Sequence, residues 1–176
     1  YAPNRDVQFL SGFLERKRGN LKKAITHFVN AEKLGRTGAA LKREIASCYF
    51  HLDQIPEAKK YVLEAMASKK DNRFVIDLAI QIAMREGDEL GARSGLENLV
   101  VVDVESFCKH RLSTIELRFG AADRALEAAQ ESVNKSEVRP TFGMLAQLAT
   151  CQIRMQMHSE AERTIQRLSK LYPNQR

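Results

Sequence analysis

The sequence has few of the residues that build covalent cross-links, metal centres or catalytic sites. Its 176 residues include 3 cysteines, 4 histidines, 4 prolines and no tryptophan. The cysteines, Cys48, Cys108 and Cys151, are odd in number and widely spaced, so we expect buried thiols and no disulfide framework. The histidines form no His-Glu-x-x-His or similar ligand spacing. We therefore expect neither a metal ion nor a cofactor.

Motifs of enzymes and of membrane proteins are also missing. The glycines occur singly, without a phosphate-binding loop, and no Gly-x-Ser-x-Gly elbow is present. An enzyme active site is therefore not expected. No apolar run reaches the ~18 residues of a membrane span, and the start does not read as a signal peptide. These absences predict a cytoplasmic protein. Because the chain begins at Tyr1 and enters its first repeat almost at once, we expect it to be a fragment of a longer protein.

An alanine recurs along the whole chain at a nearly constant interval. The intervals are 34, 34, 33 and 36 residues, and these anchor alanines are Ala24, Ala58, Ala92, Ala125 and Ala161. Such a period is typical of stacked helix–turn–helix units, none of which can bury its apolar face alone. The chain is 44% hydrophobic and shows no sustained β-branched alternation, which predicts an all-α protein.

Each repeat can be counted from its anchor alanine. Twelve residues earlier stands a residue that is small in all but one repeat: Gly12, Ala46, Ile80, Ser113 and Ala149. Five residues earlier the chain must reverse, at Gly19, Asp53, Gly87, Gly120 and Gln156, of which all but the last are turn formers. Four residues later, on the same helical face, come Phe28, Val62, Leu96, Ala129 and Ile165. This spacing predicts one apolar stripe on each second helix.

This pattern resembles the tetratricopeptide repeat. Gly12, Ala24, Phe28 and Ala31 match it best, and the ending at Pro173 is similar to the proline that closes the repeat in that family. The resemblance implies a right-handed α-solenoid of stacked antiparallel helix pairs, forming a single domain over residues 1–176. It places the repeats at about residues 5–38, 39–72, 73–105, 106–141 and 142–175.

A basic or potentially basic residue stands seven positions before every anchor alanine. The residues are Lys17, His51, Arg85, Arg118 and Arg154. The resemblance implies that this position, at the end of each first helix, borders the concave groove. Arg16, Arg43, His110 and Arg111 would widen the basic row, whereas Glu44 and Asp77 would interrupt it. Helix capping alone also explains the row, because a cation at a helix C-terminus contributes about 0.3 to 1 kcal/mol.

Several phenylalanines stand on the same first helices. Phe9, Phe13, Phe74 and Phe107 either pack in the core or serve as apolar anchors in the groove. Phe9 and Phe13, four residues apart, are expected to share a helical face. The carboxylate clamp known in the family does not fit, because these two stand where the resemblance requires Lys and Asn. A chaperone tail is therefore not the expected ligand.

Three functional hypotheses follow. The first is a protein-interaction scaffold that binds an extended or helical segment, acidic or amphipathic, in the groove. The second is a basic helical-repeat module that binds nucleic acid. The third is a regulatory or oligomerisation domain of an enzyme whose catalytic part is absent. Because Ile165, Leu168 and Leu171 lead to the end of the array without a capping helix, we also expect an apolar face there. Either the parent protein supplies a cap beyond Arg176, or the isolated fragment covers this face by homodimerisation.

Overall fold

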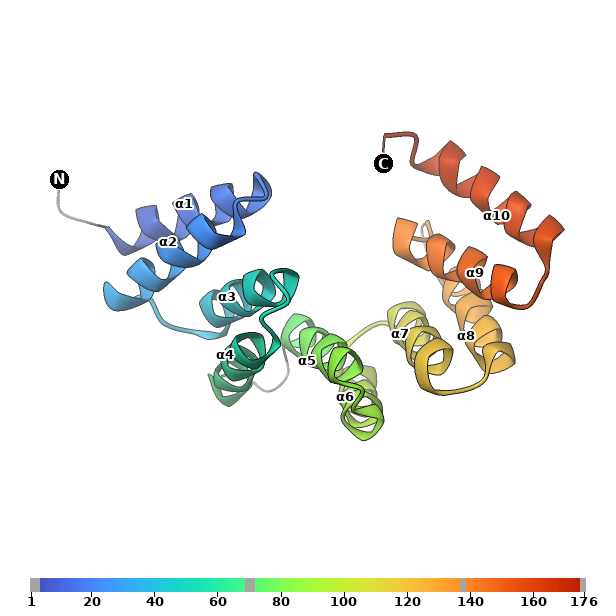
Figure 1. The fold of residues 1–176 in the computed structure, drawn as a ribbon, viewed down its shortest axis with the longest axis horizontal. Coiled ribbons are helices and arrows are strands. Elements are labelled where there is room, and N and C mark those ends of the chain that lie inside the picture. Colours follow the sequence, from blue (N-terminus) through green and yellow to red (C-terminus); the bar gives the residue numbers. More distant parts are fainter. Residues whose placement is uncertain (1–3, 69–71, 137–138, 175–176) are drawn as a thin grey trace. The chain divides into compact units, whose positions relative to one another are not determined.

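The chain folds into α-helices. The computed structural model describes residues 4–68, 72–136 and 139–174 (Figure 1). These residues contain ten helices and no strand: α1 Arg5–Lys17, α2 Leu21–Lys33, α3 Ala39–His51, α4 Ile55–Ser68, α5 Arg73–Glu86, α6 Glu89–Val102, α7 Glu105–Phe119, α8 Ala122–Asn134, α9 Phe142–Arg154 and α10 His158–Leu171. The predicted all-α helical repeat fold is confirmed. No helix in the described ranges combines the length and the apolar character that crossing a membrane would require.

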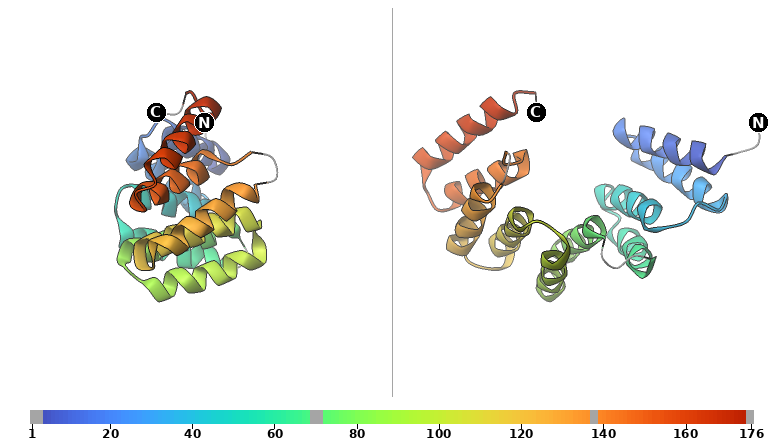
Figure 2. Two further views of the ribbon diagram at one scale, coloured as in Figure 1. Left: turned by 90° about the vertical axis from the view of Figure 1, so that its right-hand side faces the viewer. Right: turned by 180° about the vertical axis from the view of Figure 1, so that it is seen from behind.

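The contacts divide the chain into two compact units, Tyr1–Asn98 (unit 1) and Leu99–Arg176 (unit 2), with the division inside α6. In unit 1, α1 packs on α2 and α3 on α4, while α2 and α4 also contact the next first helices, α3 and α5. In unit 2, α7 packs on α8, α9 packs on α10, and α8 contacts α9. Figure 2 shows α7 and α8 side by side from two further directions. Within each unit, a first helix is thus held by the second helix of the pair before it.

The anchor alanines lie at the centre of this packing. Each is at most 3% exposed, and the position twelve residues earlier is buried in all five repeats. The reason is close helix contact: a Cβ added at Gly12 would lie 2.6 Å from Cδ1 of Phe28 on the paired helix. The repeat positions counted from the sequence are therefore the positions that the helix pairs bury.

The turns between paired helices depart from the expectation at two positions. Backbone φ is positive at four of the five predicted reversals, 82° at Gly19, 60° at Asp53, 80° at Gly87 and 58° at Gln156. Gly120, which was expected to act as a turn former, instead has φ of −111°. The Glu116 side chain occupies the place of a Cβ at Gly120, so this glycine provides space for a close approach. Gln156, the one position without a turn former, adopts the left-handed conformation.

The expected apolar face at the end of the array is only partly present. Leu168 and Leu171 pack against the core cluster of unit 2, whereas Ile165 is 45% exposed. The neighbouring side of α10 carries Glu162, Gln166 and Ser169, all exposed or half-exposed. The prediction was wrong for Leu168 and Leu171, because these leucines cover the core of their own unit. The outer side of α10 is mainly polar.

Candidate functional site

The first helices of unit 1 form a shared surface. Helix α3 contacts both α1 and α5, so the three helices lie next to one another. Two large aromatic side chains are exposed on them, Phe13 on α1 at 37% and Phe74 on α5 at 53%. Exposed apolar side chains mark interaction sites when they gather in a patch rimmed by polar groups.

A buried carboxylate on α3 links the two aromatic positions. Glu44 is only 4% exposed, and its Oε2 lies 3.0 Å from Nε of Arg16 on α1. Arg43, the preceding residue on α3, donates to Oε1 of the same carboxylate. A buried charge is stable only when it is paired, and Glu44 is paired twice. Glu44 was expected to interrupt the basic row; instead it fixes two of the arginines near that row.

Each of these arginines in turn covers an exposed phenylalanine. The guanidinium carbon of Arg16 lies 5.1 Å from the ring centroid of Phe13, and that of Arg43 lies 5.1 Å from the ring of Phe74. Contacts of this kind contribute about 0.5 to 1 kcal/mol at exposed sites. Phe13, Arg16, Glu44, Arg43 and Phe74 therefore form one connected group across three helices, which we call the Glu44 cluster. Its two arginines and one glutamate leave one excess positive charge.

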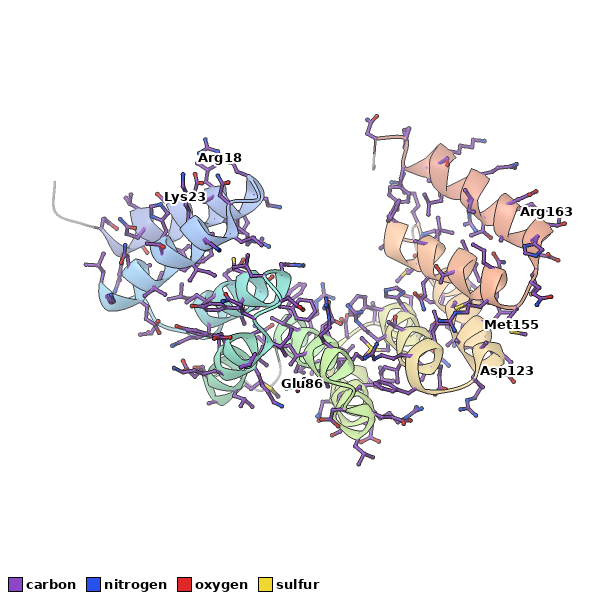
Figure 3. All side chains as sticks on the ribbon, in the orientation of Figure 1. Arg18, Lys23, Glu86, Asp123, Met155 and Arg163 are labelled. Carbon is purple, nitrogen blue, oxygen red and sulfur yellow. The ribbon has the colours of Figure 1, made fainter. Side chains whose placement is uncertain are left out.

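The predicted basic row lies where the sequence placed it, at the ends of the first helices. Lys17, His51 and Arg85 are exposed in the last turns of α1, α3 and α5, and Arg118 and Arg154 are exposed in the last turns of α7 and α9. In Figure 3, Arg18 and Lys23 mark the turn that follows Lys17. Arg85 is already engaged: its Nη1 lies 2.9 Å from Oδ1 of Asp53, and its guanidinium lies over the Phe50 ring. These positions suit helix capping, and ligand binding by the row stays a prediction.

Phe9 is not part of this surface. Its ring centroid lies 5.6 Å from that of Phe28, and it packs against the core cluster that contains Phe28. The guanidinium of Arg36 lies over the same Phe9 ring, at 3.8 Å from its centroid. Phe9 and Phe13 stand four residues apart on the same side of α1, but Phe9 packs on Phe28 whereas Phe13 is exposed.

In unit 2 the first helices α7 and α9 also contact each other. Phe107 on α7 packs against the core, and its ring contacts His110 at 6.1 Å between centroids. A Cβ added at Gly143 on α9 would lie 3.7 Å from Nε2 of His110, so the imidazole lies against α9. Phe107 and His110 are thus brought together, but Phe107 supports the core more than it offers an exposed ring.

A pocket lies between α7 and α8. This open pocket of about 190 Å³ has walls of paired charges, Lys109 with Glu131 and Arg124 with Glu116. Small side chains on α8, such as Ala128, leave the space. Among its described lining residues there is no serine, threonine, cysteine or histidine, and in the described part of the chain no three His, Cys, Asp or Glu side chains gather as metal ligands.

The three thiols are free and buried. Burial raises the pKa of the Cys48 thiol to about 11; the nearby Arg16 lowers it, and Glu44 raises it further. Burial also raises the pKa of Cys108 and of Cys151. Thiols of this kind are protonated and unreactive at neutral pH.

Comparison with known proteins identifies the architecture. Residues 146–174 match the sequence pattern of the tetratricopeptide repeat. The chain has the tetratricopeptide-repeat fold. TTC0263, a thermophilic tetratricopeptide-repeat protein of Thermus thermophilus, superposes with a TM-score of 0.83 at 15% identity, covering 97% of this chain and 92% of that one. No protein with a curated description matches the chain.

Two other solved structures show the same tetratricopeptide fold. A repeat protein from Parabacteroides merdae gives a TM-score of 0.80 at 12% identity, covering 94% of this chain and 64% of that one. A chain of the APC/C hetero-tetramer Cut9-Hcn1 gives 0.76 at 14% identity, covering 96% of this chain and 34% of that one. At these identities the likeness concerns the fold alone.

Sequence reasoning missed the central residue of the site. Glu44 was expected to interrupt the basic row because its charge is opposite to that of the row. A second signal was available, since Glu44 stands three residues after Leu41 and four before Cys48, on the side of the helix where those apolar residues lie. Only packing against Arg16, 28 residues away in sequence, shows that this carboxylate is buried and paired.

Proposed function

We propose that this tetratricopeptide array is a protein-interaction module, and that the first-helix surface of unit 1 binds an acidic, amphipathic segment of another protein. The observation that carries the proposal is the Glu44 cluster. It holds two exposed aromatic rings under two guanidinium groups, and a single buried carboxylate orders the arrangement.

The chemistry of the surface favours a ligand with both acidic and apolar side chains. Phe13 and Phe74 provide apolar area of the type that anchors interfaces. Arginines retain hydrogen-bond donors beyond those that Glu44 accepts, and a guanidinium binds carboxylates in a fork geometry. Lys17 at the end of α1 adds a further exposed cation close to Phe13, with 5.6 Å between Nζ and the ring centroid.

Pre-ordering of the cluster supports binding without a large conformational change. Side chains that are immobilised only on binding cost about 0.5 to 1.5 kcal/mol each. Arg16 and Arg43 are already held in place in the free chain, so a ligand meets a prepared surface. The fold similarity to a chain of the Cut9-Hcn1 hetero-tetramer agrees with a role in protein assembly.

Selection from a displayed library of random peptides tests the proposal. We expect enrichment of peptides that combine Asp or Glu with aromatic or aliphatic residues. The same selection on a Phe13→Ala plus Phe74→Ala variant should lose them. Enrichment of basic or uncharged peptides, or no enrichment, would contradict the proposal.

The salt dependence of binding distinguishes the nucleic-acid hypothesis from peptide binding. A phosphate-driven complex with six or more contacts loses about 10³-fold in affinity between 50 and 200 mM salt. Binding of random single-stranded or duplex oligonucleotides with that dependence, stronger than peptide binding, would favour the nucleic-acid hypothesis instead.

A further inference from the structure

The positive charge at the Glu44 cluster exceeds what one acidic side chain can neutralise. Arg16 and Arg43 share a single carboxylate, that of Glu44. Lys17 adds a third cation, with its Nζ 5.6 Å from the ring centroid of Phe13, and it forms no ion pair with a described residue. The group therefore holds three positive charges and one negative charge, which is an excess of two.

The charged residues at the start of α5 do not alter this balance. The guanidinium carbon of Arg73 lies 4.5 Å from the ring centroid of Phe74, and Asp77 stands one turn later on the same helix. The Asp77 carboxylate accepts a hydrogen bond of 2.9 Å from Nε2 of Gln81. One cation and one carboxylate add no net charge, so the excess of two positive charges remains.

Glu44 also holds the two arginines close to each other. Nε of Arg16 lies 3.0 Å from Oε2 of this carboxylate, and Nη2 of Arg43 donates to its Oε1. The carboxylate is buried, whereas the two arginine side chains are 26% and 28% exposed. A guanidinium has five N–H donors, so both arginines keep donors for a ligand that lies across them.

We infer that the acidic group bound here is a phosphate, carried by a phosphoserine or phosphothreonine of the partner segment and bridging Arg16 and Arg43. A phosphate monoester has a charge of about −1.5 to −2 at pH 7 and three acceptor oxygens, and clustered arginines are the usual partners of such groups. An Asp or Glu side chain would leave one positive charge in excess. This inference rests on the proposed function, because it specifies the anionic group of the ligand at the same site.

Three peptide libraries test the inference on the immobilised full chain. They differ only in their central residue, which is serine, glutamate or phosphoserine, and their flanking positions are random. We expect the chain to retain the phosphoserine library about tenfold or more over the glutamate library, since the phosphate accepts at least one further hydrogen bond from a charged donor. The glutamate library should in turn be retained over the serine library.

Substitutions show whether these cations make the distinction. Lys17→Gln and Arg43→Gln should each lower the preference for phosphoserine over glutamate by about three- to tenfold. Lys33→Gln is the matched control, because it removes an exposed lysine from the last turn of α2, and it should leave the preference unchanged. The preference compares two ligands on the same variant, so a general loss of stability would not produce this result. An unchanged preference in both test variants would overturn the inference.

The other outcomes separate this inference from the proposed function. Equal retention of the phosphoserine and glutamate libraries, both above serine, would overturn the inference and leave the proposed function standing. Retention of neither above serine would contradict both. Displacement of the phosphopeptides by inorganic phosphate at the same concentration would assign the cluster to the free ion. Tighter binding of a single-stranded oligonucleotide would assign it to nucleic acid, and either result would also overturn the inference.

Discussion

Ile80 on α5 fills the space beside Gly95 on α6: a Cβ added at Gly95 would lie 2.6 Å from Cγ1 of Ile80. The first repeat has the opposite arrangement, with Gly12 on the first helix and Phe28 on the second. Each of these helix pairs therefore combines one large and one very small residue at its contact. Ile80 is the one large residue among the positions twelve residues before the anchor alanines. It can be accommodated there because the residue that it meets on the paired helix is a glycine.

Gly95→Ala should consequently lower the free energy of unfolding by about 1 to 3 kcal/mol, since the added methyl overpacks a fully buried isoleucine. In an Ile80→Ala background the same change should raise stability by up to about 1 kcal/mol, because alanine is the better helix former. Urea denaturation of the four proteins measures both effects. If Gly95→Ala has the same sign in both backgrounds, the two residues do not compete for this space.

The sequence predicts the helices and their register well because both depend on local patterns. Turn residues, alanine spacing and apolar periodicity are properties of about 34 neighbouring residues. The anchor alanines and the small positions such as Ser113 are buried as expected. The contact of Ile80 with Gly95 departs from the repeat pattern. The size of either residue can be explained only when the residue that it meets on the paired helix is known.

The candidate site was less predictable, because its key contacts join residues far apart in sequence. Glu44 and Arg16 carry opposite charges on two different first helices, and periodicity does not show that they meet. Phe9 and Phe13 are identical in type and one turn apart, yet one packs on Phe28 and the other is exposed. Whether such a phenylalanine is exposed depends on the helix that packs beside it, and the sequence pattern does not identify that helix contact.

Glu44→Ala should reduce the free energy of unfolding by about 2 kcal/mol. Breaking a buried ion pair costs about 3 to 5 kcal/mol, and the partial exposure of the two arginine side chains, 26% and 28%, reduces this. Chemical denaturation with Glu97→Ala as control, an exposed or half-exposed acidic position on α6, checks the value. A Glu44→Ala variant as stable as the control would show that the carboxylate does not organise the cluster.

Alkaline pH should destabilise the chain in part through Cys48. Its pKa is about 11 in the folded chain against 9.0 ordinarily, so the folded state retains the proton longer. The stabilisation that this gives is complete below pH 9 and is lost as pH rises through 11. The prediction concerns the free energy of unfolding of wild type minus that of Cys48→Ala. We expect this difference to be about 1.4 kcal/mol smaller at about pH 10 than at about pH 7.

Denaturation curves for both proteins at about pH 7, 9 and 10 measure this change. A constant difference between wild type and Cys48→Ala across that range would mean that the thiol titrates normally and is not desolvated.

The most direct test of the proposed binding surface is calorimetric titration of a selected acidic peptide into wild type and into Phe13→Ala plus Phe74→Ala. Both rings are exposed, so the variant should keep the helical signal and melting temperature of wild type. The matched control is Leu63→Ala plus Leu90→Ala, which removes two exposed apolar side chains from α4 and α6. The account predicts an affinity loss of about 10- to 100-fold for the phenylalanine variant and no change for the control. Equal affinity of the phenylalanine variant and wild type would contradict it.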